Sequence, residues 1–193
     1  MHFNVCVFIP VKKPLDMKAP RDEVEGLVCS HIENFNEECG SGPGRYDWYE
    51  IGGRWAGVLP SKMGECDFCM LEDFRPFTRI SKGEKEMLAR KYELATLPEA
   101  EITDEKREEA RELGVTIFND ITWSTQKNPT FQQFCEDKTF YFPYSYVTHD
   151  ADWVEGDEWT IRELRKQFKS YVKGIQKNPK LKNTLVVNVD CHI

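Results

Sequence analysis

Residues 46–55 combine the side chains that recognise nucleotides, namely aromatic rings, a glycine pair and an arginine. The candidate ligand-binding residues are Asp47, Trp48, Tyr49, Gly52, Gly53, Arg54 and Trp55. Glycines let backbone amides approach an anion closely, and arginine offers a phosphate a rigid, two-pronged donor. Aromatic faces stack on bases, which contributes about 1–3 kcal/mol per base. We therefore expect this segment to bind a nucleotide-like small molecule.

The alternative interpretation of residues 46–55 is structural. Two β-rich runs, 46–51 and 54–59, flank Gly52 and Gly53. A glycine pair at this place is typical of a β-hairpin, because both central positions of a type I′ turn need a positive φ. The tryptophans would then belong to the core, and Arg54 would pair with an acid of the same segment, Glu50 or Asp47.

A second candidate site depends on the two ends of the chain. Residues 2–9 and 185–193 alternate apolar and polar side chains with the period of two that is typical of strands. If these strands are neighbours, His2 can lie on the same face as Asp190 and His192. Two imidazoles and a carboxylate could bind a ligand, hold a metal, or act as general acid and base. The alternative is that the histidines are merely exposed at chain ends.

The cysteines and common motifs indicate no cofactor. Cys66 and Cys69 form an isolated Cys-x-x-Cys, and Cys39, Cys135 and His149 stand at no recognisable zinc spacing from it. A redox role lacks the usual βαβ context. The sequence also has no Walker loop, Gly-x-Gly-x-x-Gly, Gly-x-Ser-x-Gly or His-Glu-x-x-His. We expect no disulfide, no bound metal and no cofactor.

Charge and hydropathy limit the partners. The net charge of −7 disfavours duplex nucleic acid, and no apolar run reaches the roughly 20 residues that cross a bilayer. The first residues lack the features of a signal peptide, so a cytosolic location is expected. Residues 161–182 hold eight Lys or Arg and one acid, whereas 99–112 hold seven acids and three bases. Both runs are typical of solvated helix faces, although either could dock a protein.

The elements that must position these residues follow from local periodicity. Helices are expected over 21–36, from a Ser81–Glu84 capping box to about 97, over 103–113, after Asn128 and Pro129, and from a Thr160–Glu163 capping box to about 177. Besides the hairpin, strands are expected near 2–9, 140–148, 153–154 and 185–193. The sequence thus predicts one α+β domain over residues 1–193. It should have a mostly antiparallel sheet, with the terminal strands near its centre and helices packed on it.

Two stretches of the chain resemble an uncharacterised family of bacteriophages and prophage-bearing bacteria. They are Asp-Trp-Tyr-Glu-Ile-Gly-Gly-Arg-Trp-Ala-Gly at 47–57 and Val-Asp-Cys-His-Ile at 189–193, and the opening His2-Phe3 fits as well. Residues 148–154 lack the turn glycine and the later histidine of that family, so no role is transferred to a histidine there. Residues 60–138 match no known pattern. The resemblance implies a phage setting, in the cytosol of the host cell, but no activity.

Three functions from different classes follow. The first is a non-enzymatic binder that sequesters a host immune signalling nucleotide, with Arg54 and the amides of Gly52 and Gly53 on its phosphate. The second is a metal-dependent phosphoester hydrolase that uses His2, Asp190 and His192. The third is an inhibitor that binds a protein of a host defence system. Each of the three functions is compatible with a homo-oligomer.

Overall fold

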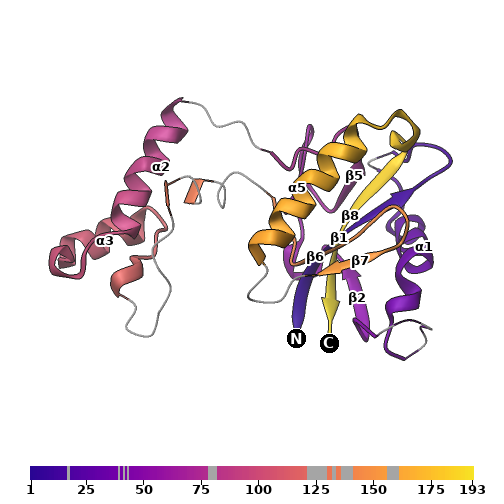
Figure 1. Ribbon diagram of the computed structural model, residues 1–193, viewed down its shortest axis with the longest axis horizontal. Helices are drawn as coiled ribbons and strands as arrows, with labels where there is room; N and C mark the ends of the chain where they lie inside the picture. The colour runs from indigo at the N-terminus through magenta and orange to yellow at the C-terminus, as the bar shows by residue number, and fades with distance from the viewer. Residues whose placement is uncertain are drawn as a thin grey trace. The chain divides into compact units, whose positions relative to one another are not determined.

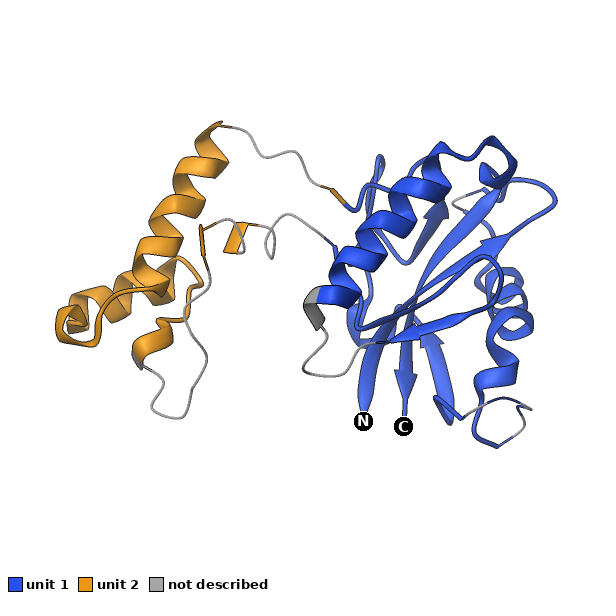
Figure 2. Cartoon of the chain, in the orientation of Figure 1, with its two compact units in different colours: residues 1–76, 141–193 blue, residues 77–140 orange. Residues whose placement is uncertain are grey.

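The structure is a computed structural model of the chain. It describes residues 1–193 except 17, 39, 41, 43, 78–81, 121–129, 132–133, 136–140 and 156–160, and except the side chains of residues 120, 161 and 162. The chain divides into two compact units, shown in Figure 2. Unit 1 comprises Met1–Pro76 and Tyr141–Ile193, and unit 2 comprises Phe77–Phe140. Along the sequence, unit 2 lies between the two parts of unit 1, and one domain over residues 1–193 stays a prediction.

Unit 1 is built on a mixed sheet with the order β2-β8-β1-β6-β7, and β5 also pairs with β8 (Figure 1). The strands are β1 (His2–Pro10), β2 (Trp48–Ile51), β5 (Phe68–Met70), β6 (Ser145–Val147), β7 (Trp153–Glu155) and β8 (Thr184–His192). The terminal strands β1 and β8 are antiparallel neighbours near the centre, from His2 opposite His192 to Pro10 opposite Thr184. β1 and β6 are parallel, so the sheet is mixed and not purely antiparallel. The α+β class is confirmed.

Both faces of the sheet are covered by helices. On one face, Val5 and Val7 of β1 pack with Val24 and Val28 of α1 (Arg21–Ile32) in the main core cluster. On the other face, Phe8 of β1 contacts Phe168 of α5 (Ile161–Lys177), with ring centroids 6.1 Å apart. The polar side chains Asn4, Asn188 and Asp190 share this second face and are buried rather than solvated, and most buried polar groups in proteins are hydrogen-bonded.

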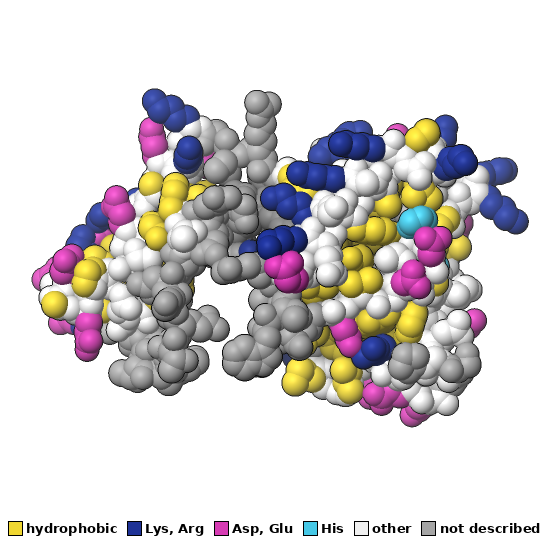
Figure 3. All heavy atoms as spheres, viewed as in Figure 1, with side chains coloured by type: hydrophobic (Ala, Val, Ile, Leu, Met, Phe, Trp, Pro, Cys, Tyr) yellow, Lys and Arg dark blue, Asp and Glu magenta, His cyan; other side chains and the backbone are white. Residues whose placement is uncertain are grey.

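The expected helices of unit 1 are present. α1 continues into the 3₁₀ turn η1 (Glu33–Phe35), and the two elements together match the predicted helix over 21–36. α5 ends before Asn178, whose side chain caps the 3₁₀ turn η5 (Pro179–Leu181) by accepting from the Lys180 amide. Basic side chains gather along the exposed side of α5 (Figure 3). The capping residues Ser81 and Thr160 lie outside the described residues.

The predicted hairpin over 46–59 is wrong. β2 pairs with β8 rather than with the segment after the glycines, and that segment begins with the 3₁₀ turn η2 (Gly53–Trp55). The next strand, β3 (Leu59–Ser61), pairs with β4 (Gly64–Cys66) in a separate two-stranded sheet. Gly52 and Gly53 do have positive φ, 70° and 50°. The local pattern therefore predicted the turn correctly. It did not predict the partner of β2, which is β8, because the sequence of a strand does not specify a partner from the opposite end of the chain.

Unit 2 is mainly helical. It contains α2 (Lys82–Ala95), η3 (Glu99–Glu101), α3 (Asp104–Glu112) and η4 (Phe118–Asp120), so the helices predicted to end near 97 and 113 are present. Arg90 of α2 donates to Glu109 of α3, and Leu88 and Ala95 form a small apolar cluster with Phe134. Asn128 and Pro129, predicted to open a helix, lie outside the described residues. None of the helices that the structure describes has both the length and the apolar character of a membrane span.

Candidate functional site

The pairing of β1 with β8 brings the terminal histidines together. His2 lies directly opposite His192, and their ring centroids are 4.8 Å apart. The prediction that the two strands are neighbours with both histidines on one face is therefore confirmed. Trp48 of β2 stacks on His192 at 5.5 Å and meets the His2 ring edge-on at 5.5 Å. Three aromatic rings thus cluster where β1 and β2 begin and β8 ends.

Each histidine is held by its own carboxylate. Nδ1 of His2 lies 2.9 Å from Oδ1 of Asp190, and Nδ1 of His192 lies 2.9 Å from Oδ1 of Asp47. The bond from His192 lowers the pKa of the Asp47 carboxyl, which also accepts from the Trp48 amide. In both pairs the bonded Nδ1 leaves Nε2 as the second ring nitrogen for other contacts. Across the described residues, no three His, Cys, Asp or Glu side chains group in a way that would hold a metal ion.

The glycine pair encloses carboxylates of the protein itself. A Cβ on Gly53 would lie 2.4 Å from Cβ of Asp190, and one on Gly52 would lie 2.6 Å from Oδ1 of Asp67. The Arg54 amide donates to Oδ2 of Asp190 at 3.0 Å. The Gly52 amide donates to the backbone oxygen of residue 188. The amides of Gly52 and Arg54 are thus engaged within the fold rather than turned to an external anion.

The side chain of Arg54 is exposed, and Glu50 has a different partner. Nη2 of Arg21 lies 3.8 Å from Oε1 of Glu50. Arg21 also donates to the backbone oxygen of Ile51. Among the ion pairs of the described residues, Glu50 pairs with Arg21 and not with Arg54. The predicted Arg54–Glu50 pair is therefore wrong.

A buried polar network lies beside these groups. The Asn188 amide donates to the backbone oxygen of Trp55 at 2.7 Å, and the Tyr141 hydroxyl donates to Oδ1 of Asn188 at 3.0 Å. Tyr141 also contacts the side chain of Asn4, and burial raises its pKa well above the ordinary value. Oδ1 of Asn4 is buried and has no hydrogen-bond partner within the part of the chain that the structure describes. Asn4 thus presents an unsatisfied acceptor.

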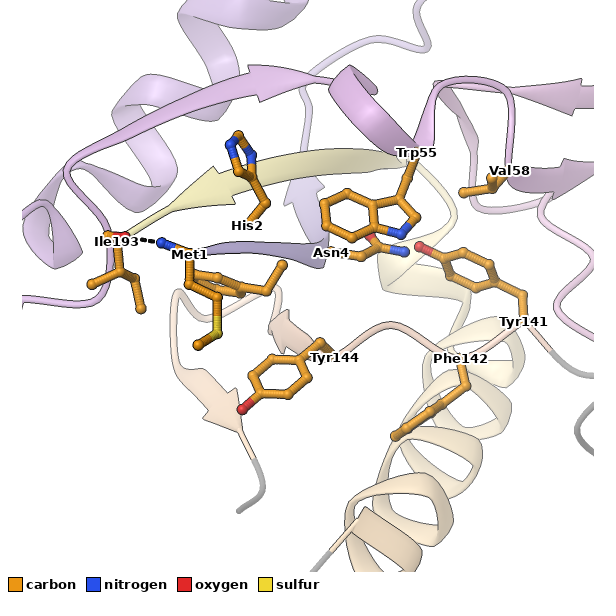
Figure 4. A pocket seen from close by; sticks show the side chains of 10 residues that line it. Met1, His2, Asn4, Trp55, Val58, Tyr141, Phe142, Tyr144 and Ile193 are labelled. Atoms are coloured by element: carbon orange, nitrogen blue, oxygen red, sulfur yellow. Dashed lines mark hydrogen bonds between the residues drawn. The ribbon is translucent and has the colours of Figure 1, made fainter. Parts of the chain in front are cut away.

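A pocket of about 510 Å³ opens next to this network (Figure 4). The side chains that line the pocket include His2, Asn4, Trp55, Tyr141, Phe142 and Tyr144. In Figure 4 the Trp55 ring lies beside Asn4, and the Tyr141 hydroxyl points toward the Asn4 amide. Aromatic side chains therefore form most of the wall, and the Asn4 amide supplies a polar group between them.

The pocket includes part of the predicted site and adds residues that the sequence did not single out. His2 and Trp55 line it, whereas Asp190 and His192 lie next to it through their contacts with His2. The added residues are Asn4, Tyr141, Phe142 and Tyr144. The aromatic run after residue 140 predicted a strand, and nothing in its local pattern indicated a pocket wall.

Comparison of the chain with protein-family models, curated proteins and solved structures finds no match. The geometry of the pocket is therefore the basis for inferring a function.

Proposed function

We propose that unit 1 binds a small, nucleotide-like molecule in the pocket and does not convert it. The observation that carries this proposal is the unsatisfied Oδ1 of Asn4, which is buried among aromatic side chains. A buried acceptor without a donor costs about 1–3 kcal/mol. That oxygen has almost no accessible surface in the free protein, so a ligand that donates an N–H to it would remove the cost once the Asn4 amide turns toward the pocket. The edge of a nucleobase carries such donors, next to a flat face that stacks.

The walls of the pocket suit the flat face of a base. Trp55, Tyr141, Phe142 and Tyr144 come from two separate parts of the chain and line one cavity. Base stacking on such side chains contributes about 1–3 kcal/mol per base. The volume of about 510 Å³ lies within the range of roughly 300–1,000 Å³ that is usual for small-molecule sites.

His2 supplies a polar group at the same pocket. Its Nδ1 is oriented by Asp190, so its Nε2 is the ring nitrogen that can contact the ligand. The exposed Arg54, next to Trp55 in η2, is the candidate counter-ion for a ligand phosphate. The resemblance to bacteriophage proteins favours a host signalling nucleotide, which the protein would sequester.

A hydrolase is the second candidate, and the pairing of His2 with Asp190 favours it. Asp190 is 1% exposed and lies 2.9 Å from the imidazole. A carboxylate that orients a histidine is the usual arrangement of a general base. In this role His2 would activate a water molecule for attack on a phosphoester in the pocket.

The two candidates are separated by the fate of the ligand. The purified chain is screened against a nucleotide library by thermal shift, and bound material is released by denaturation and identified by mass. A ligand at about 100 times its Kd should stabilise the fold by about 2.7 kcal/mol. Recovery of the intact nucleotide supports the binder. Recovery of a hydrolysed product, with turnover lost in His2→Gln, supports the hydrolase.

Asn4→Leu tests the pocket itself. This change removes the unsatisfied oxygen but also the hydrogen bond between the Asn4 amide and Tyr141, so its two effects on the stability of the free protein oppose each other, while the ligand-induced shift should be lost. Ser145→Ala is the matched control, because Oγ of Ser145 is also buried without a partner among the described residues and does not line the pocket. It should keep the ligand-induced shift. An undiminished shift in Asn4→Leu would overturn the proposed binding mode.

A further inference from the structure

One side of α5 carries a row of basic residues. Arg165, Lys169, Lys173 and Lys177 follow one another four residues apart, so they share one side of the helix and rise by about 6 Å from each to the next. Lys173 and Lys177 are exposed, and Arg165 and Lys169 are half-buried. Figure 3 shows basic side chains gathered along this helix. These four residues form the basic row.

The helix itself contributes little negative charge beside the basic row. Residues 163–182 hold seven Lys or Arg and a single acid, Glu163. The Glu163 carboxylate lies 2.8 Å from Nζ of Lys166, which is not part of the row. The row therefore makes α5 a positive surface on a chain whose net charge is −7. A surface of this kind attracts an anion that carries several charges in series.

The basic row begins at the wall of the pocket. The Arg165 guanidinium lies over the Phe142 ring, with its central carbon 5.0 Å from the ring centroid. Phe142 lines the pocket, and its ring centroid lies 6.1 Å from that of Phe168 on the buried side of α5. Figure 4 shows the Phe142 ring next to the helix. A ligand in the pocket would therefore meet the first charge of the row at Phe142, and the later charges farther along α5.

We propose that the ligand of the pocket is a short single-stranded oligonucleotide whose backbone phosphates lie along the basic row. This inference rests on the proposed function, because it requires a base in the pocket. Arg54 is then the counter-ion of the nucleotide that is bound in the pocket, and the row binds the phosphates of the nucleotides that follow. Proteins that bind single strands combine a positive surface along the backbone with aromatic side chains that stack on bases. An acidic protein would use the charge but would leave the aromatic pocket without an occupant.

The experiment measures how the full chain binds labelled single-stranded tetranucleotides of each base, in ribo and deoxy form, by fluorescence anisotropy at several salt concentrations. Lys169→Gln/Lys173→Gln should weaken binding by roughly two- to thirtyfold, which is the effect of losing two exposed ion pairs. The slope of log K against log [salt] should become shallower by about 0.7 per charge removed, or about 1.4 in total. The matched control is Lys13→Gln/Lys18→Gln, which removes two exposed lysines from the segment between β1 and α1. It should leave the affinity and the slope unchanged.

The four mononucleotides separate this inference from the proposed function. The wild type should bind a tetranucleotide more tightly than its mononucleotide and with a steeper salt slope, and Lys169→Gln/Lys173→Gln should bind the mononucleotide as the wild type does. Mononucleotide binding without any gain for the tetranucleotide would overturn this inference and leave the proposed function standing. If neither binds the wild type, both fail.

The link between the pocket and the basic row is tested by Asn4→Leu and by competition. Asn4→Leu should lose the tetranucleotide together with the mononucleotide, because the base anchors the strand. Polyglutamate should displace a labelled tetranucleotide less well than the unlabelled tetranucleotide does, since it has no base for the pocket. Full binding in Asn4→Leu, or equal displacement by polyglutamate, would overturn the inference, because the row would then act as a general surface for polyanions such as acidic proteins.

Discussion

The imidazole of His2 and the carboxylate of Asp190 are joined by a 2.9 Å hydrogen bond, although 188 positions separate them in the chain. The same carboxylate accepts from the Arg54 amide at 3.0 Å. Asp190 therefore ties β8 to β1 and to the turn that carries Trp55 toward the pocket. Asp190 is almost fully buried. Weakening its hydrogen bonds should therefore lower the free energy of unfolding.

Asp190→Asn should lower the free energy of unfolding by about 1.5–3 kcal/mol, because it replaces charge-assisted hydrogen bonds with weaker ones. Urea denaturation measures the loss. Glu50→Gln is the control, since Glu50 lies opposite Asp190 in the β2–β8 pairing but has an exposed side chain. That variant should stay within about 0.5 kcal/mol of the wild type. Equal losses in the two variants would contradict this role for Asp190.

Gly53→Ala should destabilise the fold more than Gly57→Ala. Both glycines have positive φ, 50° and 73°, so each alanine costs about 1–2 kcal/mol of backbone strain. A Cβ at Gly53 would also collide with Asp190 at 2.4 Å, whereas one at Gly57 meets no atom within 4 Å. The collision should add about 1–3 kcal/mol. Thermal or urea unfolding of the two variants gives the difference, and indistinguishable stabilities would show that Asp190 shifts aside easily.

His192→Ala should raise the pKa of Asp47 toward its ordinary value of 3.8, because the bond from His192 is the largest cause of the lowered pKa. In the folded wild type the ionised carboxylate is favoured. Its stabilising effect is present above about pH 3.8 and is lost as pH falls through the lower folded pKa. The variant should lose this pH dependence. NMR titration of the Asp47 carboxyl carbon measures the change.

His149→Ala is the matched control for that titration. His149 contacts Tyr171 and Asp150 and does not touch Asp47 in any contact that the described residues make. It should leave the Asp47 titration unchanged. An Asp47 titration that is the same in His192→Ala and the wild type would contradict the assigned cause.

Arg54→Ala should weaken binding of a phosphorylated ligand by about ten- to a hundredfold, because hydrogen bonds to charged groups contribute about 1.5–3 kcal/mol. The fold should keep its stability, since the side chain is exposed. Arg21→Ala is the control, because Arg21 contacts Glu50 and the Ile51 backbone oxygen. Calorimetric titration with the nucleotide found in the screen measures both affinities. Equal affinities would show that the phosphate does not reach Arg54.

Local periodicity was sufficient to predict the terminal strands and two helices of unit 1, although it paired residues 46–51 with the wrong segment. The alternation of residues 2–9 and 185–193 predicted two strands and placed His2 and His192 on one face, because a period of two fixes the face once two strands pair. The three- and four-residue spacing of apolar residues likewise predicted α1 and α5. In these segments the pattern is local, and each one buries a face that its own sequence defines.

The tertiary structure alone decided what covers those faces. The alternation of the terminal strands puts Asn4, Asn188 and Asp190 on one face of the sheet, and the structure buries all three. The groups that cover them include Trp55 and Tyr141, which bond to Asn188 from 133 and 47 positions away. A periodic pattern shows which side chains share a face, but it carries no information about a distant segment that packs on that face. The hydrogen bonds of the site and the pocket itself therefore follow from long-range packing, while the strands and helices that hold them follow from the sequence.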